Sequence, residues 1–594
     1  QIFSQMSLKQ KIPFVPGLSF KGTFAYDPTF SFHKVWNPPI RQSVLDRSQT
    51  PPKIVPGIFG QTRASLDQND SRMERYTFQA GVDFERSFGF NNIKFTGVLE
   101  TIQDHASSMG AFRRNFNLLM DELSLGSSSN ADMRTSGISS NARQVGLVYR
   151  VNYDYNNKYM FEASGRYDGS YYFSKNKRFG FFPAFSLGWN IAKENFIKDN
   201  LSWVNVLKIR SSYGEVGALA GAPFQYLSTF NIVGPGYRIG GEGVQIANEN
   251  SEANPVITWE RSKKTDVGFD GSFFNYQFDF GFDYFFEKRS NMLVQPLVTV
   301  PREYGIGLGQ ENAGIMQNQG IEVTAAFHHR FNQELSINLT GNFTYAHNKV
   351  LQIFETSATY NNLNRRLTGR PLGEQFGYKF IEYFLPKDFD QNGNLKSGIA
   401  TQPWGKVFPG DMRYQDTNGD GKIDINDQVP IGEPINPQIV YGFSPSINYK
   451  GFDVNLLFQG AAKVNYYIRS EAIWPFWNSM AAFKDNFDYW RPDNLNAAFP
   501  RITLAPTTNN TQTSSHWMQN VSYLRLKNIM VSYDFMRLMK SNMADNIKSL
   551  KLFVSGQNMV TWTKIKNLDP EMINTRGDSY PQQKVLSVGV NVGF

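Results

Sequence analysis

The chain has 594 residues, of which 41% are hydrophobic and 15% aromatic, yet its mean hydropathy is polar at −0.41. This combination is unusual in a soluble protein and suits a membrane β-barrel, in which alternate residues face lipid and a wet interior. No apolar stretch approaches the roughly 18 residues that a membrane-spanning helix needs, which excludes a helical membrane protein. Cysteine is absent, which excludes disulfides, thiolate metal sites and a cysteine nucleophile.

The net charge of +8 does not predict a nucleic-acid partner, because the 60 basic residues are dispersed and form no basic run. The chain begins with Gln1, and no charged segment followed by an apolar one opens it. We therefore expect its first residue to be internal to a longer chain or to follow a processing site.

Apolar and polar residues alternate with a period of two along many segments, which indicates strands with two different faces. From Tyr276 to Tyr284 every second residue is Tyr or Phe, and the residues between them are Gln, Asp or Gly. About sixteen such segments are near or above the roughly 9–11 residues that cross a bilayer at a tilt. The predicted strands lie at 17–27, 72–87, 91–103, 144–154, 157–169, 181–193, 204–214, 262–272, 275–288, 319–330, 333–347, 439–449, 452–463, 521–534, 548–561 and 583–594.

The connections between these strands alternate between tight turns, such as Asn156-Asn157, and long segments. The long segments lie at 28–71, 104–143, 215–261, 289–318, 348–438 and 464–520. Short periplasmic turns and long outer loops are typical of outer-membrane barrels. A soluble β-sandwich or propeller array is the alternative, but its strands are about 5–6 residues long and do not expose rows of aromatic residues. The sequence therefore predicts an all-β fold, a transmembrane antiparallel β-barrel with long extracellular loops.

The long loop 348–438 contains a segment that follows the calcium-loop scheme. Calcium is a hard ion that needs many oxygen ligands, and the scheme supplies them with a sharp turn at Gly421. The predicted ligands are Asp416, Asn418, Asp420, Lys422 through its carbonyl, Asp424 and Asp427. Position twelve is Asp instead of Glu, and no helical pattern flanks the loop, so it resembles dockerin-like loops more than paired EF-hands. We expect a structural calcium ion; the alternative is a cluster of Asn, Asp and Gly turns without metal.

No motif predicts an enzyme. The six histidines have no metal-ligand spacing, and no Gly-x-Ser-x-Gly elbow stands between a strand and a helix. Charged residues that alternate within the predicted strands, such as Glu162 and Arg166, most simply line a polar interior.

Several motifs from about residue 144 to the end resemble the SusC/RagA family of TonB-dependent outer-membrane transporters. No single motif is decisive, but their order and spread are specific. They are Arg166-Tyr-Asp-Gly-Ser170, Phe181-Phe-Pro-Ala-Phe-Ser-Leu-Gly-Trp189, Leu207-Lys-Ile-Arg-Ser-Ser-Tyr-Gly214, Trp259-Glu260, Asn318-Gln-Gly-Ile-Glu322, Tyr523-Leu-Arg-Leu-Lys-Asn528, Ser555-Gly-Gln-Asn558, Asp569-Pro-Glu571 and Tyr580-Pro581.

The resemblance implies a 22-stranded barrel with a plug inside it and a SusD-like surface lipoprotein over its outer mouth. Glycans or peptides would be captured between the two proteins, and energy would reach the plug through TonB. The 594 residues supply about sixteen of the expected strands; the N-terminal strands, the plug and the TonB-contacting segment are absent from them. The resemblance also leaves open a dimer of the transporter–lipoprotein pair, in contact with outer-membrane lipid.

The loop 464–520 is rich in aromatic residues, which stack on sugar rings but also pack loops and meet protein partners. The predicted substrate or lid contacts are Trp474, Phe476, Trp477, Tyr489 and Trp490. Packing or contact with the partner is favoured over a glycan path.

The resulting functional prediction is import of oligosaccharides or peptides across the outer membrane of a Gram-negative, Bacteroidetes-like cell. A passive porin-like channel is the first alternative, and a structural or binding component of an outer-membrane complex is the second.

Overall fold

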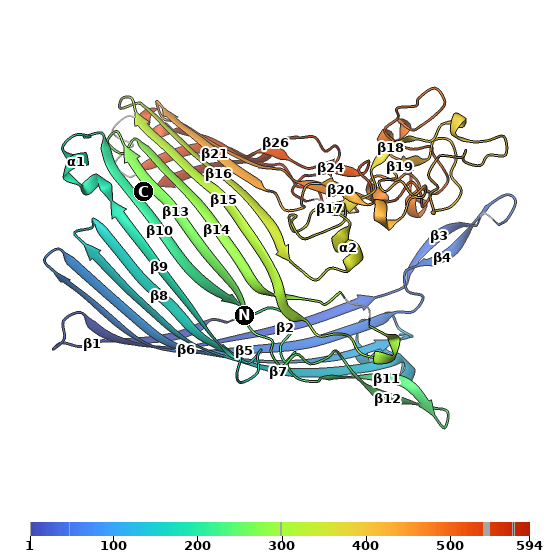
Figure 1. Ribbon diagram of the computed structural model, residues 1–594, viewed down its shortest axis with the longest axis horizontal. Coiled ribbons are helices and arrows are strands. Elements are labelled where there is room, and N and C mark those ends of the chain that lie inside the picture. Colours follow the sequence, from blue (N-terminus) through green and yellow to red (C-terminus); the bar gives the residue numbers. More distant parts are fainter. Residues whose placement is uncertain (1, 47, 298–299, 539–546, 573, 575) are drawn as a thin grey trace.

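The computed structural model describes residues 2–46, 48–297, 300–538, 547–572, 574 and 576–594. Its main feature is one antiparallel sheet in which seventeen of the described strands pair in a simple up-and-down order. Figure 1 shows that this sheet curves into a wall, from the blue strands of the first third to the red strands at the end of the chain. The alternating segments of the sequence therefore form neighbouring strands of a single sheet.

The wall consists of long strands that follow one another along the chain. In order they are β1 (Ser4–Lys11), β2 (Leu18–Asn37), β5 (Ser65–Phe88), β6 (Asn91–Arg114), β7 (Met133–Tyr155), β8 (Tyr159–Ser170), β9 (Phe179–Asn190), β10 (Val204–Ala218), β13 (Glu260–Phe273), β14 (Phe278–Val294), β15 (Glu311–Arg330), β16 (Leu335–Gln352), β21 (Ile439–Tyr449), β22 (Phe452–Ala462), β25 (Tyr523–Asp534), β26 (Ser549–Thr563) and β27 (Val585–Gly593).

Smaller elements lie in the connections. Five two-stranded sheets are formed by β3 (Ile40–Asp46) with β4 (Lys53–Phe59), β11 (Phe230–Ile239) with β12 (Glu242–Glu249), β17 (Gln375–Gly377) with β20 (Val429–Gly432), β18 (Phe380–Tyr383) with β19 (Met412–Tyr414), and β23 (Asn465–Tyr467) with β24 (Met518–Asn520). The α-helices are single short turns, α1 (Asn195–Lys198) and α2 (Ser357–Asn361). No helix in the described part of the chain is long and apolar enough to cross a membrane.

All sixteen predicted strands are present, and the structure adds β1, which the sequence did not predict. The segment of β1 offers only two large apolar residues on one face, Met6 and Leu8, so its alternation is too weak to stand out. It nevertheless pairs with β2 over its whole length. The count of strands in the wall is therefore one higher than predicted.

The predicted loops 28–71 and 104–143 were wrong in extent, because their outer parts continue the strands. The ladder between β5 and β6 is unbroken from Ser65 paired with Arg114 to Phe88 paired with Asn91. The added parts of β5, β6 and β7 carry polar residues on both faces, which weakens the period-two signal while the backbone still pairs. The added part of β2 keeps the alternation, with Phe30, Phe32 and Trp36 on one face, so this strand was predicted to end too early. The true connections are the residues between the strand ends, 38–64 and 115–132.

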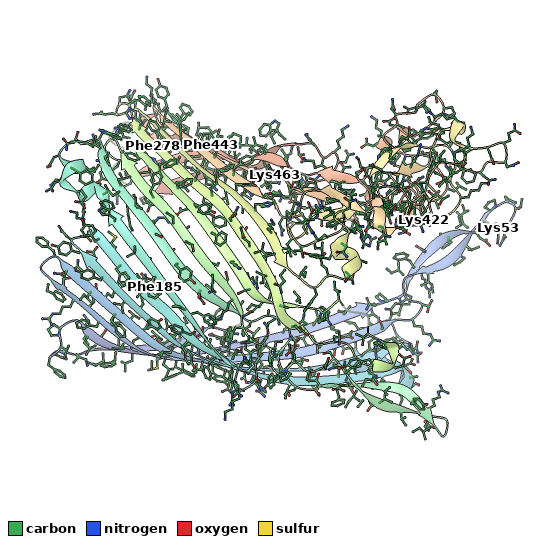
Figure 2. All side chains as sticks on the ribbon, viewed as in Figure 1. Lys53, Phe185, Phe278, Lys422, Phe443 and Lys463 are labelled. Carbon is green, nitrogen blue, oxygen red and sulfur yellow. The ribbon has the colours of Figure 1, made fainter. Side chains whose placement is uncertain are left out.

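Short turns and long connections gather at opposite ends of the wall, as predicted. Figure 1 shows α1 at one end and the hairpins β3–β4 and β11–β12 at the other, and Figure 2 places Lys53 and Lys422 at the end opposite Phe278. We call these the turn end and the loop end. Within the described residues, β1 pairs only with β2 and β27 only with β26, so each leaves one edge of the sheet without a partner strand.

The outer face of the wall carries an apolar band bordered by aromatic residues. In β8, exposed Tyr159 and Tyr167 point outward eight residues apart; in β9, exposed Trp189 and Phe181 do the same. Eight residues at about 3.3 Å each, tilted by about 40°, span roughly 20 Å. This is close to the height of the apolar belt of outer-membrane barrels, roughly 25 Å.

Candidate functional site

The inner face of the wall is polar and holds a chain of charged side chains, as predicted for Glu162 and Arg166. Its centre is Arg210 on β10, which makes ion pairs with Asp266 at 3.2 Å, Asp270 at 3.0 Å and Asp283 at 2.5 Å. These side chains converge because successive strands place every second residue on the same face in register. Three carboxylates around one guanidinium leave an excess of negative charge at this point.

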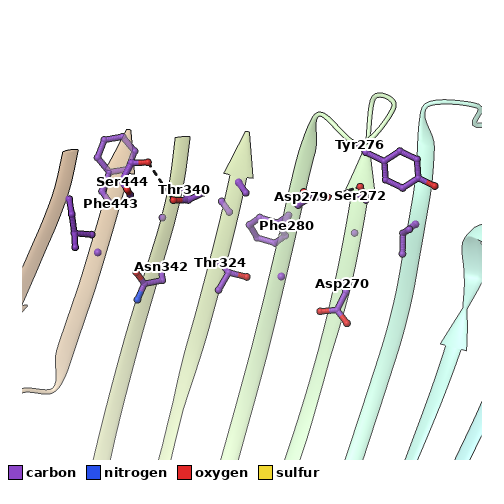
Figure 3. A pocket seen from close by; sticks show the side chains of 18 residues that line it. Asp270, Ser272, Tyr276, Asp279, Phe280, Thr324, Thr340, Asn342, Phe443 and Ser444 are labelled. Atoms are coloured by element: carbon purple, nitrogen blue, oxygen red, sulfur yellow. Dashed lines mark hydrogen bonds between the residues drawn. The ribbon is translucent and has the colours of Figure 1, made fainter. Parts of the chain in front are cut away.

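Two hollows lie beside Arg210 on the inner face. The larger has a volume of about 710 Å³ and lies where β13, β14, β15, β16 and β21 run side by side (Figure 3). Apart from Tyr276, its polar lining consists of short side chains, namely Asp270, Ser272, Asp279, Thr324, Thr340, Asn342 and Ser444. The smaller, of about 360 Å³, includes Arg210, Lys208 and Glu162. Both volumes lie in the range of ligand pockets, about 300–1,000 Å³.

The chemistry of the larger hollow is that of a hydrogen-bonding surface. The Ser272 hydroxyl donates to Asp279 at 2.6 Å, and Thr340 donates to the Ser444 carbonyl at 3.4 Å (Figure 3). Among the described residues that line it there is no histidine to serve as the base for either hydroxyl. Such a surface can hold polar solutes or a polypeptide by hydrogen bonds.

Arg166, from the first of the quoted motifs, forms another cluster on the inner face. Its guanidinium donates to Asp168 at 2.9 Å and to Glu100 on β6 at 3.4 Å. The cluster borders a third hollow of about 270 Å³, whose lining includes Trp259. The motif residues therefore organise the polar lining of the wall.

Two further motifs of the sequence meet around Arg525. The Arg525 side chain, 1% exposed, pairs with Asp569 at 2.7 Å and Glu571 at 2.6 Å, and Lys527 pairs with Glu571 at 3.1 Å. Tyr523 also donates its hydroxyl to Glu571. The connection after β26 is thus tied to the inner face of β25. The sequence singled out both motifs but did not predict that they meet.

The connections 353–438 and 463–522 fold together at the loop end, and we call them the loop module. They share an aromatic core that neither could form alone. Its buried residues are Tyr378, Tyr383, Met412, Tyr414, Ile423, Trp474, Trp490, Ala497 and Trp517. Because four of these nine come from the second connection, the two predicted loops are one packed unit rather than independent segments.

The five aromatic residues predicted as substrate or lid contacts lie in different environments. Trp474 and Trp490 are buried in the core of the loop module at 6% and 7% exposure, where they pack against other residues of the module. Trp477 packs edge-on against Trp474 at 4.9 Å between ring centroids. Phe476 and Tyr489 are half-buried, and Arg491 lies over the Tyr489 ring. The packing interpretation holds for the two buried tryptophans.

A buried polar network supports the same module. Asp411 is fully buried and accepts from Arg501 at 2.8 Å and from Asn510 at 2.9 Å. Nearby, His516 lies edge-on to Phe380 and donates its Nε2–H to the Ala498 carbonyl at 2.9 Å. Burial lowers the pKa of His516 to about 4, so its imidazole is neutral at pH 7.

The predicted calcium loop lies in the loop module, and its carboxylates bind backbone amides. Asp416 accepts from the amides of Gly419 and Gly421 at 2.7 and 2.8 Å; desolvation opposes ionisation there, but these donors hold the pKa of Asp416 below its ordinary value. Asp427 is fully buried, and its two oxygens accept from Thr417 and Asp424, both at 2.8 Å.

The remaining predicted ligands continue this turn structure. The Asn418 side chain accepts from the Asp420 amide, Asp420 accepts from the Lys422 amide, and Asp424 accepts from the Asn426 amide. In the described part of the chain, no three His, Cys, Asp or Glu side chains are grouped as metal ligands. The side chains of the predicted loop therefore accept hydrogen bonds from backbone amides within the loop. Asp427 joins its two ends, because it binds the amides of Thr417 and Asp424.

Comparison with known proteins identifies relatives along nearly the whole chain. The family model described as TonB dependent receptor-like, beta-barrel matches residues 17–559. TonB-dependent receptor P3 of Formosa agariphila is 29% identical over 98% of this chain and 57% of its own length. TonB-dependent receptor SusC of Bacteroides thetaiotaomicron is 25% identical over 76% of this chain and 44% of its own length. The chain thus spans about half the length of the curated relatives that it matches.

Solved structures show the same fold. The RagAB peptide transporter has a TM-score of 0.77 with 20% identity, over 100% of this chain and 62% of its own chain. The RagAB peptide importer in the 'open-open' state has a TM-score of 0.75 with 18% identity over the same shares. At these identities the likeness concerns the fold of the wall and its loops.

Proposed function

Because the chain belongs to the TonB dependent receptor-like β-barrel family, we propose that it forms the greater part of the wall of an outer-membrane importer for oligosaccharides or peptides. The family places the chain in the outer membrane, among receptors and transporters and not among enzymes. One observation carries the proposal: the same strands present an apolar band outside and a polar, hollowed surface inside. Such a wall separates lipid from a passage for polar solutes.

Among the relatives, only the printed titles of the solved structures name a substrate class, and that class is peptides. The structures with TM-scores of 0.77 and 0.75 are named as a peptide transporter and a peptide importer, whereas SusC is named only as a TonB-dependent receptor. The inner hollows offer hydroxyl, amide and carboxylate groups, which hydrogen-bond sugars and peptide groups alike. The proposal therefore keeps oligosaccharides and peptides together as substrates.

We further propose that the importer works with a SusD-like surface lipoprotein and with TonB, the latter through a plug outside these 594 residues. The surface available for the lipoprotein is the loop end. There the hairpin β11–β12 projects from the wall (Figure 1) and exposes Ile232, Tyr237 and Ile239, at 67–70% each. Large apolar side chains on a projecting hairpin are typical of a surface that a partner covers.

Whole-cell uptake tests the proposal. Cells lacking the gene for the full-length protein are compared with wild-type cells for uptake of labelled oligosaccharides and labelled peptides. We expect deletion to abolish uptake of one class, and dissipation of the proton-motive force to do the same in wild-type cells. Uptake that requires the gene but survives the loss of proton-motive force would instead establish the passive channel. Unchanged uptake in the deletion strain would establish a structural or binding component.

A third proposal concerns the cofactor: calcium bound by the Asp416 loop, with a structural role in the loop module. It is supported by the spacing of the acidic residues and by the turn of Gly421, whose φ is +82°. Asp416, Asn418, Asp420 and Asp424 supply side-chain oxygens, and Lys422 supplies its carbonyl. The ion would offset the negative charge of this turn and order the loop.

A further inference from the structure

A groove of about 460 Å³ runs along the outer face of the wall near the turn end, across β7, β8, β9 and β10. Its walls are large outward-facing apolar side chains, among them Phe161, Leu187 and Ile209, which are 40–61% exposed. The hollow arises at Ser211, which stands in one row of the sheet between Leu187 and Val267. A small side chain among large ones leaves a dent in a surface that is otherwise filled.

The end of the groove nearest the turns has a rigid polar rim. Three donors meet at Glu194: the Tyr159 hydroxyl at 2.7 Å, the Trp189 indole N–H at 2.9 Å and the Lys158 ammonium at 2.6 Å. These bonds hold the rings of Tyr159 and Trp189 at the mouth of the groove. They also satisfy Glu194, whose charge is balanced by Lys158.

A second lysine stands beside this rim without a counter-charge. Lys193, the last residue of the 3-10 turn η3 (Ile191–Lys193), is exposed and donates to the Asn156 carbonyl at 3.4 Å. In the described part of the chain it makes no ion pair, whereas Lys158 does. The groove is therefore apolar along its length and carries a free positive charge at the end that faces the periplasmic side.

We propose that this groove is a binding site for a glycerophospholipid of the periplasmic leaflet. One acyl chain lies in the dent over Ser211, and the phosphate lies against Lys193. Two observations select this occupant. The groove opens on the face that meets lipid, and the charge at its end complements an anionic headgroup. Trp189 and Tyr159 stand at headgroup level, where amphipathic rings are enriched.

The site lies back to back with the smaller inner hollow. Both are lined by Met160, Leu187, Gly188 and Arg210, so one thickness of sheet separates them. The backbone of Gly188 is part of this layer, and the side chains of Lys208 and Met160 lie beside it. A lipid held outside therefore steadies the part of the wall that carries Arg210 inside.

Native mass spectrometry of the full-length transporter, released from mild detergent, tests this site. The probes are phosphatidylglycerol, which is anionic, and phosphatidylcholine, which has no net charge. We expect Ser211→Leu, which fills the dent with a side chain suited to the lipid face, to weaken retention of both lipids by roughly tenfold, about 1.4 kcal/mol. We expect Lys193→Gln to weaken phosphatidylglycerol more than phosphatidylcholine, because the choline of phosphatidylcholine already balances the charge of its phosphate. The matched controls are Thr265→Leu, another outward position, and Lys450→Gln, at another turn.

The outcomes separate lipid binding from its rivals. Equal lipid retention in Ser211→Leu and Thr265→Leu would overturn the site. A changed ratio of dimer to monomer in Ser211→Leu, with lipid retention unchanged, would identify the groove as an interface between two copies and would also overturn it. Lys193 lies in a turn and not in a strand of the wall, so Lys193→Gln should still fold if Ser211→Leu fails to reach the membrane. In that case the Lys193→Gln comparison decides. An unchanged preference for phosphatidylglycerol over phosphatidylcholine would refute the proposal.

Discussion

Arg525 and Asp569 form a two-pronged ion pair, in which the Nη2 of Arg525 donates to both carboxylate oxygens of Asp569, at 2.8 and 2.7 Å. The bond joins a wall strand to a connection that begins after Thr563, and it is shielded because the arginine side chain is 1% exposed. Removing one partner of a buried pair leaves an uncompensated charge. Charge therefore holds the connection after β26 to the wall, together with the apolar packing of Ile565 and Leu568.

The first prediction follows from this pair. We expect Asp569→Ala to loosen the connection after β26 by about 1–3 kcal/mol, because Arg525 stays buried and loses its two-pronged partner, while Glu571 remains as its counter-charge. Protease cleavage of that connection in the folded barrel should rise accordingly. The control is Asp578→Ala, whose partner Arg576 is 56% exposed and 3.6 Å away; an exposed pair is worth about 0–1 kcal/mol. Equal protease resistance in both variants would contradict the role of Arg525.

The second prediction concerns Gly410 in the loop module. Gly410 has a φ of +89°, and a Cβ built on it would lie 2.3 Å from the ring of Trp490. We expect Gly410→Ala to displace Trp490 from the core and to destabilise the module by about 2–4 kcal/mol, as strained backbone adds to overpacking. Thermal unfolding of the loops, followed by tryptophan fluorescence, measures the change.

Gly419→Ala is the matched control for this substitution. Its φ is +77°, but a Cβ there would meet no atom within 4 Å. Gly419→Ala should lower the free energy of unfolding only through its strained backbone, by about 1 kcal/mol. If the two variants unfold at the same temperature, the packing of Trp490 against Gly410 does not stabilise the module.

The wall was predictable because its signal is local. The alternation from Phe452 to Phe458 located β22 to within one residue, and β21 was predicted with its observed bounds, Ile439–Tyr449. A strand that faces lipid on one side and water on the other must alternate, so the period-two signal is strong there. Beyond the membrane both faces meet water. The start of β5 therefore has the pattern of a loop, although its backbone pairs in full with the outer half of β2.

The sites were less predictable because they depend on contacts that are distant in sequence. Asp569 is 44 residues from Arg525, and no local pattern says that the connection returns to the inner face. Aromatic residues serve cores and binding surfaces alike, so Trp474 and Trp490 could be assigned to the core only once the packing of two connections was known. Turn chemistry is local, which is why the sequence alone located the tight turns of the Asp416 loop, whose amides bind the Asp416 carboxylate.

The third prediction is a pH dependence centred on His516. Burial lowers its pKa from 6.5 to about 4, so between these values the unfolded module binds a proton that the folded module does not. Stability from this residue is therefore fully present above pH 6.5 and is lost as the pH falls towards 4, by at most about 3 kcal/mol. Thermal unfolding of the loops at pH 7.5 and pH 4.5 should show a smaller difference in His516→Gln than in the wild type. An equal difference in both proteins would assign the acid sensitivity to other groups.

The fourth prediction tests calcium at the Asp416 loop. A ligand that binds only the folded state stabilises it by about 2.7 kcal/mol at a hundredfold excess over its Kd. We expect calcium to raise the unfolding temperature of the wild-type loop module, and a chelator to lower it again. Asp420→Asn keeps an acceptor for the Lys422 amide but removes a charge that faces the turn, so it should abolish most of the calcium shift.

The control for calcium is Asp46→Asn, which removes a carboxylate from a turn outside the loop module, where Asp46 accepts from Ser48. This variant should keep the full calcium shift, since only the Asp416 loop combines closely spaced oxygens with the turn at Gly421 required by the scheme. Magnesium, which demands octahedral geometry and releases its water reluctantly, should give a smaller shift than calcium at equal concentration. A wild-type module whose unfolding temperature is indifferent to calcium would leave the loop as a metal-free turn cluster, stabilised by Asp416 and Asp427 through the amides they already bind.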